Sequence, residues 1–150
     1  MKVEHISFEQ IKQYWQKHLW QNRKTEILPV SHMCFLGGTH KYILHQYQPF
    51  FLGIFDGIDL IAVNSCHKTT DFSMRSRGIH VNPNYRKQGI AGLLFKETFK
   101  IAQQQKCSNV WSIPRQSSLE TYLKYGFVVF GDKIEDLEFG PNYWVLKTID

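Results

Sequence analysis

Cysteine is scarce in this sequence, and long apolar runs are missing. The 150 residues contain three cysteines, Cys34, Cys66 and Cys107, at wide spacings and without a Cys-x-x-Cys pair. This argues against a disulfide scaffold and against a cysteine-based zinc site. The first five residues are too polar for a signal-peptide core, and apolar stretches such as residues 50–55 are far shorter than the roughly 18 residues that span a bilayer. We therefore expect a soluble, cytoplasmic protein that does not act at a membrane.

Several catalytic and metal-binding motifs are also missing. The seven histidines form neither His-x-His nor His-Glu-x-x-His, and no Gly-x-Ser-x-Gly turn occurs. These patterns would indicate a zinc site or a serine hydrolase. We therefore expect no metal, and no cysteine can be assigned to a nucleophilic pair.

Composition and length indicate one folded domain over residues 1–150. Hydrophobic residues make up 43% of the chain and charged residues 21%, which is ordinary globular usage. No repeat, linker or shift in composition divides the chain.

Acidic residues are missing from one stretch of a chain whose net charge is +5. Between Asp71 and Glu97 the only charged residues are cations, so a polyanion would bind there favourably, although a solvated surface is the commoner explanation of such a run. The cations are Arg75, Arg77, Arg86, Lys87 and Lys96. The opposite cluster, near the C-terminus, comprises Asp132, Glu135, Asp136 and Glu138.

Hydrophobic periodicity predicts strands and helices that alternate along most of the chain. This order indicates an α/β or α+β fold with one mixed sheet and helices on both of its faces. We expect strands over residues 2–6, 50–55, 58–66, 74–81, 110–113, 127–131 and 142–149. We expect helices over residues 8–21, within 22–45, over 90–105 and around 119–123.

A strand, a tight loop and the start of a helix meet between Ile79 and Gly92. The first turn of a helix offers unpaired N–H groups and the positive end of a dipole, which together bind phosphate. Gly89 would let the backbone approach a ligand closely, and Arg86 and Lys87 add positive charge. This junction is therefore the first candidate binding site.

Neither the dinucleotide fingerprint nor the P-loop pattern occurs at this junction. Instead, Arg86-x-x-Gly89-x-Ala91 resembles the acetyl-CoA loop of the GCN5-related N-acetyltransferase (GNAT) family, whose pattern is Gln/Arg-x-x-Gly-x-Gly/Ala. A second element strengthens the resemblance. The family typically places a Tyr four residues before a Gly-Phe pair, and this chain has Tyr122 before Gly126-Phe127.

The resemblance implies a fold, a reaction and a set of site residues. The fold would be a twisted mixed sheet of six to seven strands, and the reaction would move an acetyl group from acetyl-CoA to the amine of a small molecule or peptide. Tyr122 would act as general acid toward the CoA sulfur. The residues implied in CoA binding are Ile79, His80 and Val81 on the strand, and Arg86, Lys87, Gln88, Gly89, Ile90, Ala91 and Gly92 at the loop and helix start.

The sequence also departs from the family pattern. Arg115 stands where the family commonly has an Asn that binds the cofactor arm, and we assign Arg115 to the cofactor site. Val110 stands where many members carry a Glu as general base. The base is therefore not readable from a motif, and the candidates are His80, Asp71 and His67.

Two other functions remain open at this stage, together with the acceptor and the oligomeric state. A basic nucleic-acid-binding module is one, although we expect no nucleic-acid partner, and a catalytically silent GNAT-like protein that only binds CoA is the other. The acidic residues 132–138 are hypothesised to attract a cationic amine. The chain is expected to be a monomer or a homodimer.

Overall fold

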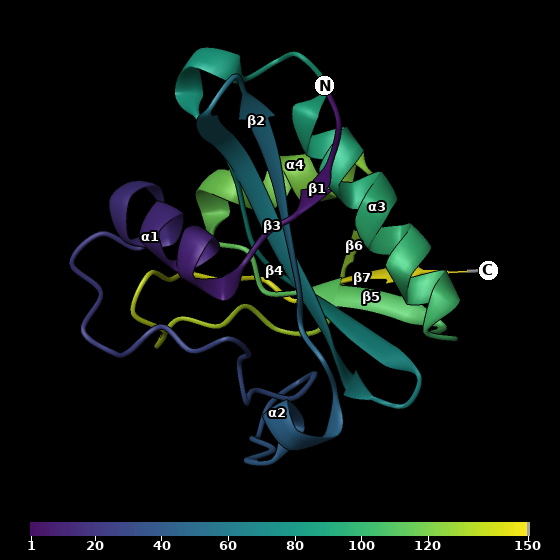
Figure 1. Cartoon of the computed structure of the whole chain (residues 1–150). Helices are drawn as coiled ribbons and strands as arrows, with labels where there is room; N and C mark the ends of the chain where they lie inside the picture. The colour runs from purple at the N-terminus through teal and green to yellow at the C-terminus, as the bar shows by residue number, and fades with distance from the viewer. Residues whose placement is uncertain (150) are drawn as a thin grey trace.

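The computed structural model describes residues 1–149 and contains a seven-stranded sheet in the order β1-β2-β3-β4-β5-β7-β6 (Figure 1). Neighbouring strands are antiparallel except β4 and β5, which are parallel. The strands are β1 (Glu4–His5), β2 (Phe50–Asp56), β3 (Asp59–Thr70), β4 (Ser73–Val81), β5 (Asn109–Ser112), β6 (Val128–Val129) and β7 (Val145–Thr148). The helices are α1 (Phe8–His18), α2 (Ile43–Gln46), the 3-10 turn η1 (Pro83–Tyr85), α3 (Ile90–Gln104) and α4 (Gln116–Lys124).

This arrangement confirms the predicted fold class, with corrections at the ends of elements. The first helix was expected to reach residue 21 but ends at His18, because the Trp20 N–H bonds the carbonyl of Trp15 at 2.7 Å and turns the chain. The Trp20 ring then packs on the Trp15 ring, with centroids 4.7 Å apart. The strand predicted over 58–66 continues to Thr70, the two last strands are shorter than predicted, and the short helix expected within 22–45 is α2.

Helix α1 covers one face of the sheet. Ser7 and Gln10 form a reciprocal capping box at its start, as their spacing suggests. Ile11 and Trp15 are fully buried against Val63 of β3. Burial of one apolar stripe therefore anchors α1 on this face.

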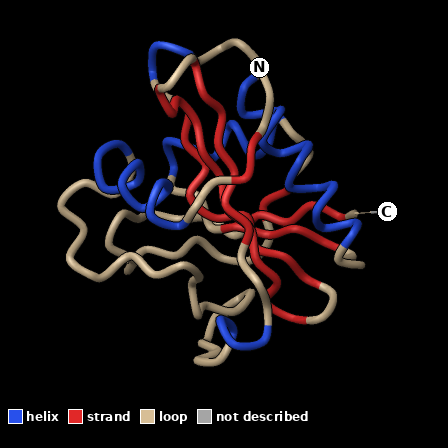
Figure 2. The backbone as a smooth tube through the Cα atoms, in the orientation of Figure 1, coloured by secondary structure: helices blue, strands red, loops and turns tan. Residues whose placement is uncertain are grey.

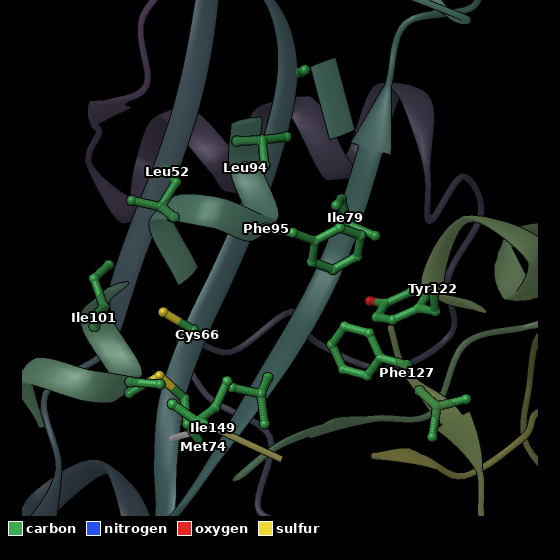
Figure 3. Close-up of a cluster of buried hydrophobic side chains, with 14 of the residues drawn as sticks. Leu52, Cys66, Met74, Ile79, Leu94, Phe95, Ile101, Tyr122, Phe127 and Ile149 are labelled. Atoms are coloured by element: carbon green, nitrogen blue, oxygen red, sulfur yellow. The ribbon is translucent and has the colours of Figure 1, made fainter. Parts of the chain in front are cut away.

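Helices α3 and α4 cover the opposite face, where the larger core lies (Figure 3). Leu94 and Phe95 of α3 are fully buried, and Phe95 contacts both Tyr122 and Phe127 ring to edge or tilted, with centroids 5.1 and 5.4 Å apart. A Cβ at Gly92 would lie 2.7 Å from the Tyr125 ring, so the small residue lets α3 and α4 pack closely.

The sheet opens between its two parallel strands. Only Ser73–Arg75 of β4 pairs with β5, and beyond this point no strand pairs with that edge of β4 within the described residues. The part of β4 that has no partner on the β5 side contains a β-bulge. There, Gly78 and Ile79 lie opposite the single residue Asn64 of β3. The gap between β4 and β5 and the bulge therefore both lie in the C-terminal half of β4, just before the loop that contains Arg86.

Two long loops, residues 19–42 and 130–144, lie side by side next to α1 (Figures 1 and 2). The backbone N–H of Lys24 donates to a carboxylate oxygen of Glu138 at 2.8 Å and ties one loop to the other. Segments that are more than 100 residues apart in the sequence thus lie together beside the opening in the sheet.

Candidate active site

The turn before α3 has the geometry of an anion site. Gly89 is the N-cap of α3 with a φ of 77°, and Lys87 also adopts a positive φ of 62°. No side chain caps this helix end. Since α3 begins at Ile90, the N–H groups of its first turn have no partner earlier in the helix. A Cβ at Gly89 would meet no atom within 4 Å, so the turn faces open space.

A groove of about 610 Å³ runs from this turn along β4 to α4. Nine of the eleven residues assigned to the cofactor site from the sequence line it, and Gln88 and Gly92 do not. The nine are Ile79, His80, Val81, Arg86, Lys87, Gly89, Ile90, Ala91 and Arg115. We call this the cofactor groove.

His80 is held between two partners in the cofactor groove. Its Nδ1 lies 2.8 Å from the Tyr14 hydroxyl, which itself donates to the Ile61 carbonyl at 3.1 Å. The His80 Nε2 lies 3.4 Å from Nη2 of Arg86. Burial, with the nearby charge of Arg86, lowers the pKa of His80 to about 4. Both ring nitrogens are engaged, so His80 serves better to orient Arg86 than as a general base.

A second cavity, of about 360 Å³, lies on the other side of the opening in the sheet, and we call it the acceptor cavity. Its wall includes Trp20 and Arg23 from the first long loop and Asp136, Glu138 and Phe139 from the second. The two cavities share the lining residues Leu19, Ile79, Arg115 and Ser118. A ligand in the cofactor groove and a ligand in the acceptor cavity would therefore meet at this junction.

Tyr122 lines the acceptor cavity although it is only 2% exposed. It comes from α4, and its hydroxyl points toward β4 (Figure 3). Burial raises the pKa of Tyr122, and a hydrogen bond of 3.2 Å that the Ser112 hydroxyl donates to the Tyr122 oxygen opposes part of that increase. The phenol is therefore protonated at neutral pH and can donate a proton or a hydrogen bond.

Arg115 lies at the junction of the two cavities. Its Nη2 donates to the Leu19 carbonyl at 3.0 Å, and its guanidinium lies 4.9 Å from the centre of the Phe139 ring. Burial lowers the pKa of Arg115. Through these contacts Arg115 joins the start of α4 to both long loops, a role that an Asn at this position is too short to fill.

The other two candidate bases lie outside the site. His67 is fully buried and Asp71 is exposed near the β3–β4 turn, where it accepts a hydrogen bond from the Tyr47 hydroxyl at 2.7 Å. Neither residue lines the cofactor groove or the acceptor cavity. Val110 is fully buried in the core.

The acidic segment divides into two parts. Asp136 and Glu138 line the acceptor cavity, whereas Glu135 is exposed and pairs with Lys133 at 3.3 Å. Of the four acidic residues of this segment, only Asp136 and Glu138 therefore line the acceptor cavity. Within residues 1–149, no three His, Cys, Asp or Glu side chains gather as metal ligands would, and the expected absence of metal stays a prediction.

The sequence interpretation missed the cationic wall of the acceptor cavity. Arg75 and Arg77 lie on the same face of β4 as α1, because side chains alternate along a strand. They had been grouped with Arg86 and Lys87, which belong to the cofactor groove. Arg75 and Arg77 are two residues apart in a strand, which indicates that both face the same side of the sheet. Arg86 and Lys87 follow the strand, so this spacing could have separated the two pairs of cations.

A family model now identifies the class of protein. The model of the acetyltransferase (GNAT) family matches residues 11–127. This match covers most of the chain, so the protein belongs to the GNAT acetyltransferase family. A search of the curated proteins found no significant match.

Solved structures support the same fold. A proposed N-acetyltransferase from Lactobacillus plantarum is 15% identical, with a TM-score of 0.69 and 99% of both chains covered. PaiA N-acetyltransferase from Thermoplasma acidophilum, in complex with coenzyme A, is 20% identical with a TM-score of 0.57, and the match covers 71% of this chain and 65% of that one. Ard1 from Thermoplasma volcanium is 17% identical with a TM-score of 0.60, covering 66% of this chain and 70% of that one.

No helix among residues 1–149 is long and apolar enough to cross a membrane.

Proposed function

We propose that this protein transfers the acetyl group of acetyl-CoA to a primary amine, with Tyr122 as the general acid. The observation that carries the proposal is the junction of the two cavities. One contains the open first turn of α3, the other contains Tyr122, and they meet at Ile79 on the unpaired edge of β4. The CoA complex of the related PaiA structure supports CoA as the ligand of the groove.

The groove offers separate contacts for two parts of CoA, the pyrophosphate and the pantetheine arm. The pyrophosphate would accept hydrogen bonds from the backbone N–H groups of residues 87–92, beside the charge of Arg86. The pantetheine arm would lie along Ile79–Val81 as an added strand, since no other strand occupies that edge within residues 1–149. In this arrangement the thioester would lie at the end of the groove nearest to the acceptor cavity.

The reaction exchanges one bond for another at the thioester carbonyl. The lone pair of the amine attacks the carbonyl carbon, the C–N bond forms, and the C–S bond breaks as the sulfur receives a proton from Tyr122. The nitrogen then loses its surplus proton to give the neutral amide, and a proton from solvent restores the Tyr122 phenol. An alkylammonium is mostly protonated at neutral pH and must lose its proton before attack. Asp136 and Glu138 are the carboxylates of the acceptor cavity, and we assign this proton to them.

Replacing Tyr122 by Phe tests the proposal. The substitution removes the acidic proton but keeps the ring that packs on Phe95 and Phe127. We expect kcat for thiol release from acetyl-CoA, measured over a panel of amines, to fall about tenfold or more. Tyr143→Phe is the matched control, because its hydroxyl bonds only Gln116 at 2.8 Å and lies outside both cavities.

Two outcomes would contradict the proposal. A Tyr122→Phe variant that folds normally, as judged by its Tm, and keeps the kcat of the wild type would remove Tyr122 from the chemistry. A wild-type protein that binds CoA but releases no thiol with any amine would instead indicate a CoA-binding protein without transferase activity.

A further inference from the structure

Arginines dominate the charge of the acceptor cavity. Four of them contribute to its lining, against the two carboxylates of the second loop. The four are Arg23, Arg75, Arg77 and Arg115. A cationic amine alone would be repelled by this excess of positive charge, whereas a ligand that also carries a negative charge would be attracted.

Arg75 is buried and is the least satisfied of the four. It is 8% exposed, and its Nε is buried without a hydrogen-bond partner. Its guanidinium lies 5.3 Å from the centre of the Trp111 ring, which supplies packing but accepts no conventional hydrogen bond. A buried donor without a partner is costly and rare in folded proteins, and here it lines a cavity.

Aromatic rings and neutral oxygen atoms hold Arg77 and Arg23 in position, and the charge of Glu138 offsets part of the charge of Arg23. The guanidinium of Arg77 lies 5.2 Å from the Trp15 ring and 5.1 Å from the Trp20 ring, and that of Arg23 lies 4.8 Å from the Trp20 ring. Arg77 donates to the Leu28 carbonyl at 2.8 Å. Within residues 1–149, no carboxylate lies within 4 Å of Arg23, Arg75, Arg77 or Arg115.

The charges of these arginines oppose one another. Burial, with the charge of Arg23, lowers the pKa of Arg75 to about 10. Burial, followed by the charges of Arg75 and Arg23, lowers the pKa of Arg77 well below its usual value. Like charges held together in a partly dry cavity raise the free energy of the empty protein, and a bound anion would relieve that cost.

Building on the proposed function, we infer that the amine acceptor also carries an oxyanion, a carboxylate or a phosphate, which Arg23, Arg75 and Arg77 bind. The planar guanidinium matches both groups and binds them through paired hydrogen bonds. The amine end of the same molecule would face Asp136 and Glu138. The acceptor is therefore zwitterionic, with both charges matched by the wall of the cavity.

The dimensions of the cavity favour a small molecule over a long chain. At about 360 Å³ it lies at the small end of ligand pockets, and Tyr122 lines the same space as Arg75. Burial raises the pKa of Tyr122, and the positive charge of Arg75 opposes part of that increase, as expected for two groups that line the same cavity. An acceptor whose acid group binds Arg75 would therefore hold its amine within a few bonds of the reacting carbonyl.

Paired acceptors that differ only in the acid group test this inference. The panel contains α-amino acids with their amides, aminoalkyl phosphates with the matching amino alcohols, and spermidine. We expect kcat/KM for the better acid-bearing class to exceed that of its neutral partner about tenfold or more, and the class that shows this ratio identifies the oxyanion. Arg23→Gln and Arg75→Gln should each reduce the ratio toward one, mainly through KM.

Lys41→Gln is the matched control. It removes the same charge from an exposed position on the first long loop, outside both cavities, and should leave the ratio unchanged. Equal kcat/KM for acid-bearing and neutral partners, or a preference for spermidine, would overturn the inference while leaving the transferase function intact. The same holds if the ratio survives in both arginine variants.

A binding measurement decides the inference if no amine is acetylated, in which case the proposed function fails separately. With saturating CoA present to fill the groove, inorganic phosphate and glutarate are titrated against the Tm of the wild type and of Arg75→Gln. A rise in Tm of the wild type that Arg75→Gln loses would support the oxyanion site. Equal shifts in both proteins, or no shift in either, would overturn it.

Discussion

At the scale of single residues, Gly89 determines whether the first turn of α3 can receive a pyrophosphate. Its φ of 77° is unfavourable for any residue with a Cβ, and the space beyond it is open. Alanine there would tilt or shield the N–H groups that a phosphate needs. We expect Gly89→Ala to raise the Kd for CoA about tenfold or more, measured by calorimetry, at a stability cost of about 1–2 kcal/mol.

Gly57→Ala separates the binding effect from backbone strain. Gly57 has a φ of 61°, and its Cβ would also meet nothing within 4 Å, but it lies outside the cofactor groove. The control should lose similar stability and keep the Kd for CoA. If both variants bind CoA as tightly as the wild type, the turn before α3 is not the pyrophosphate site.

Spacing along the chain made some site residues predictable and hid others. Gly89 and Tyr122 were identified from local patterns, and the structure places them on the two cavities that meet. Arg75 and Arg77 were seen only as part of a basic run. The cavity that they line is completed by Trp20 and Glu138, which come from distant loops, so no local pattern could reveal it.

At the scale of the element, β4 opens the sheet because of its bulge. Gly78 has a φ of 76°, and a Cβ there would lie 2.6 Å from the Trp15 indole, whose Nε1 donates to the Gly78 carbonyl at 2.8 Å. Alanine would therefore push α1 away from β4 as well as strain the backbone. We expect Gly78→Ala to destabilise the protein about 2 kcal/mol more than Gly38→Ala in urea denaturation.

Gly38 is a suitable reference for this measurement. Its φ of 81° is close to that of Gly78, but its Cβ would point into open space. Equal losses of stability in the two variants would mean that contact with Trp15 adds nothing to backbone strain. The glycine within a predicted strand was a usable sign of a bulge, whereas the early end of α1 was not readable, since it depends on the packing of Trp20 on Trp15.

At the scale of the whole molecule, the family layout was predictable and the acceptor cavity was not. Alternating periodicity and two motifs were enough to indicate a mixed sheet with helices on both faces, and seven strands are present in residues 1–149. The cavity wall is built by residues 19–42 and 130–144, which have little regular structure and contact each other across the chain. Periodicity carries no information about such segments.

The whole molecule should also lose stability as the pH falls below about 6.5, the ordinary pKa of histidine. Burial lowers the pKa of His67 well below this value, with Arg75 and Arg77 adding to the effect, and the pKa of His80 falls to about 4. Between these folded values and 6.5 the unfolded chain binds more protons than the folded chain, so the free energy of unfolding rises with pH.

Variants at these histidines test this dependence through the slope of the free energy of unfolding against pH, from urea titrations at pH 5, 5.5, 6 and 7. The slope does not depend on how much each substitution destabilises the protein at one pH. His67→Leu removes a fully buried imidazole and should lower the slope near pH 5.5 by up to about 1.4 kcal/mol per pH unit, the value for one proton. His80→Asn can still donate to Tyr14 and should reduce the slope near pH 5.5 by a similar amount, because a pKa of about 4 leaves His80 mostly unprotonated in the folded protein at that pH. If both variants keep the wild-type slope, neither histidine is held neutral by the fold, and the low-dielectric surroundings assigned to Arg75 would be wrong.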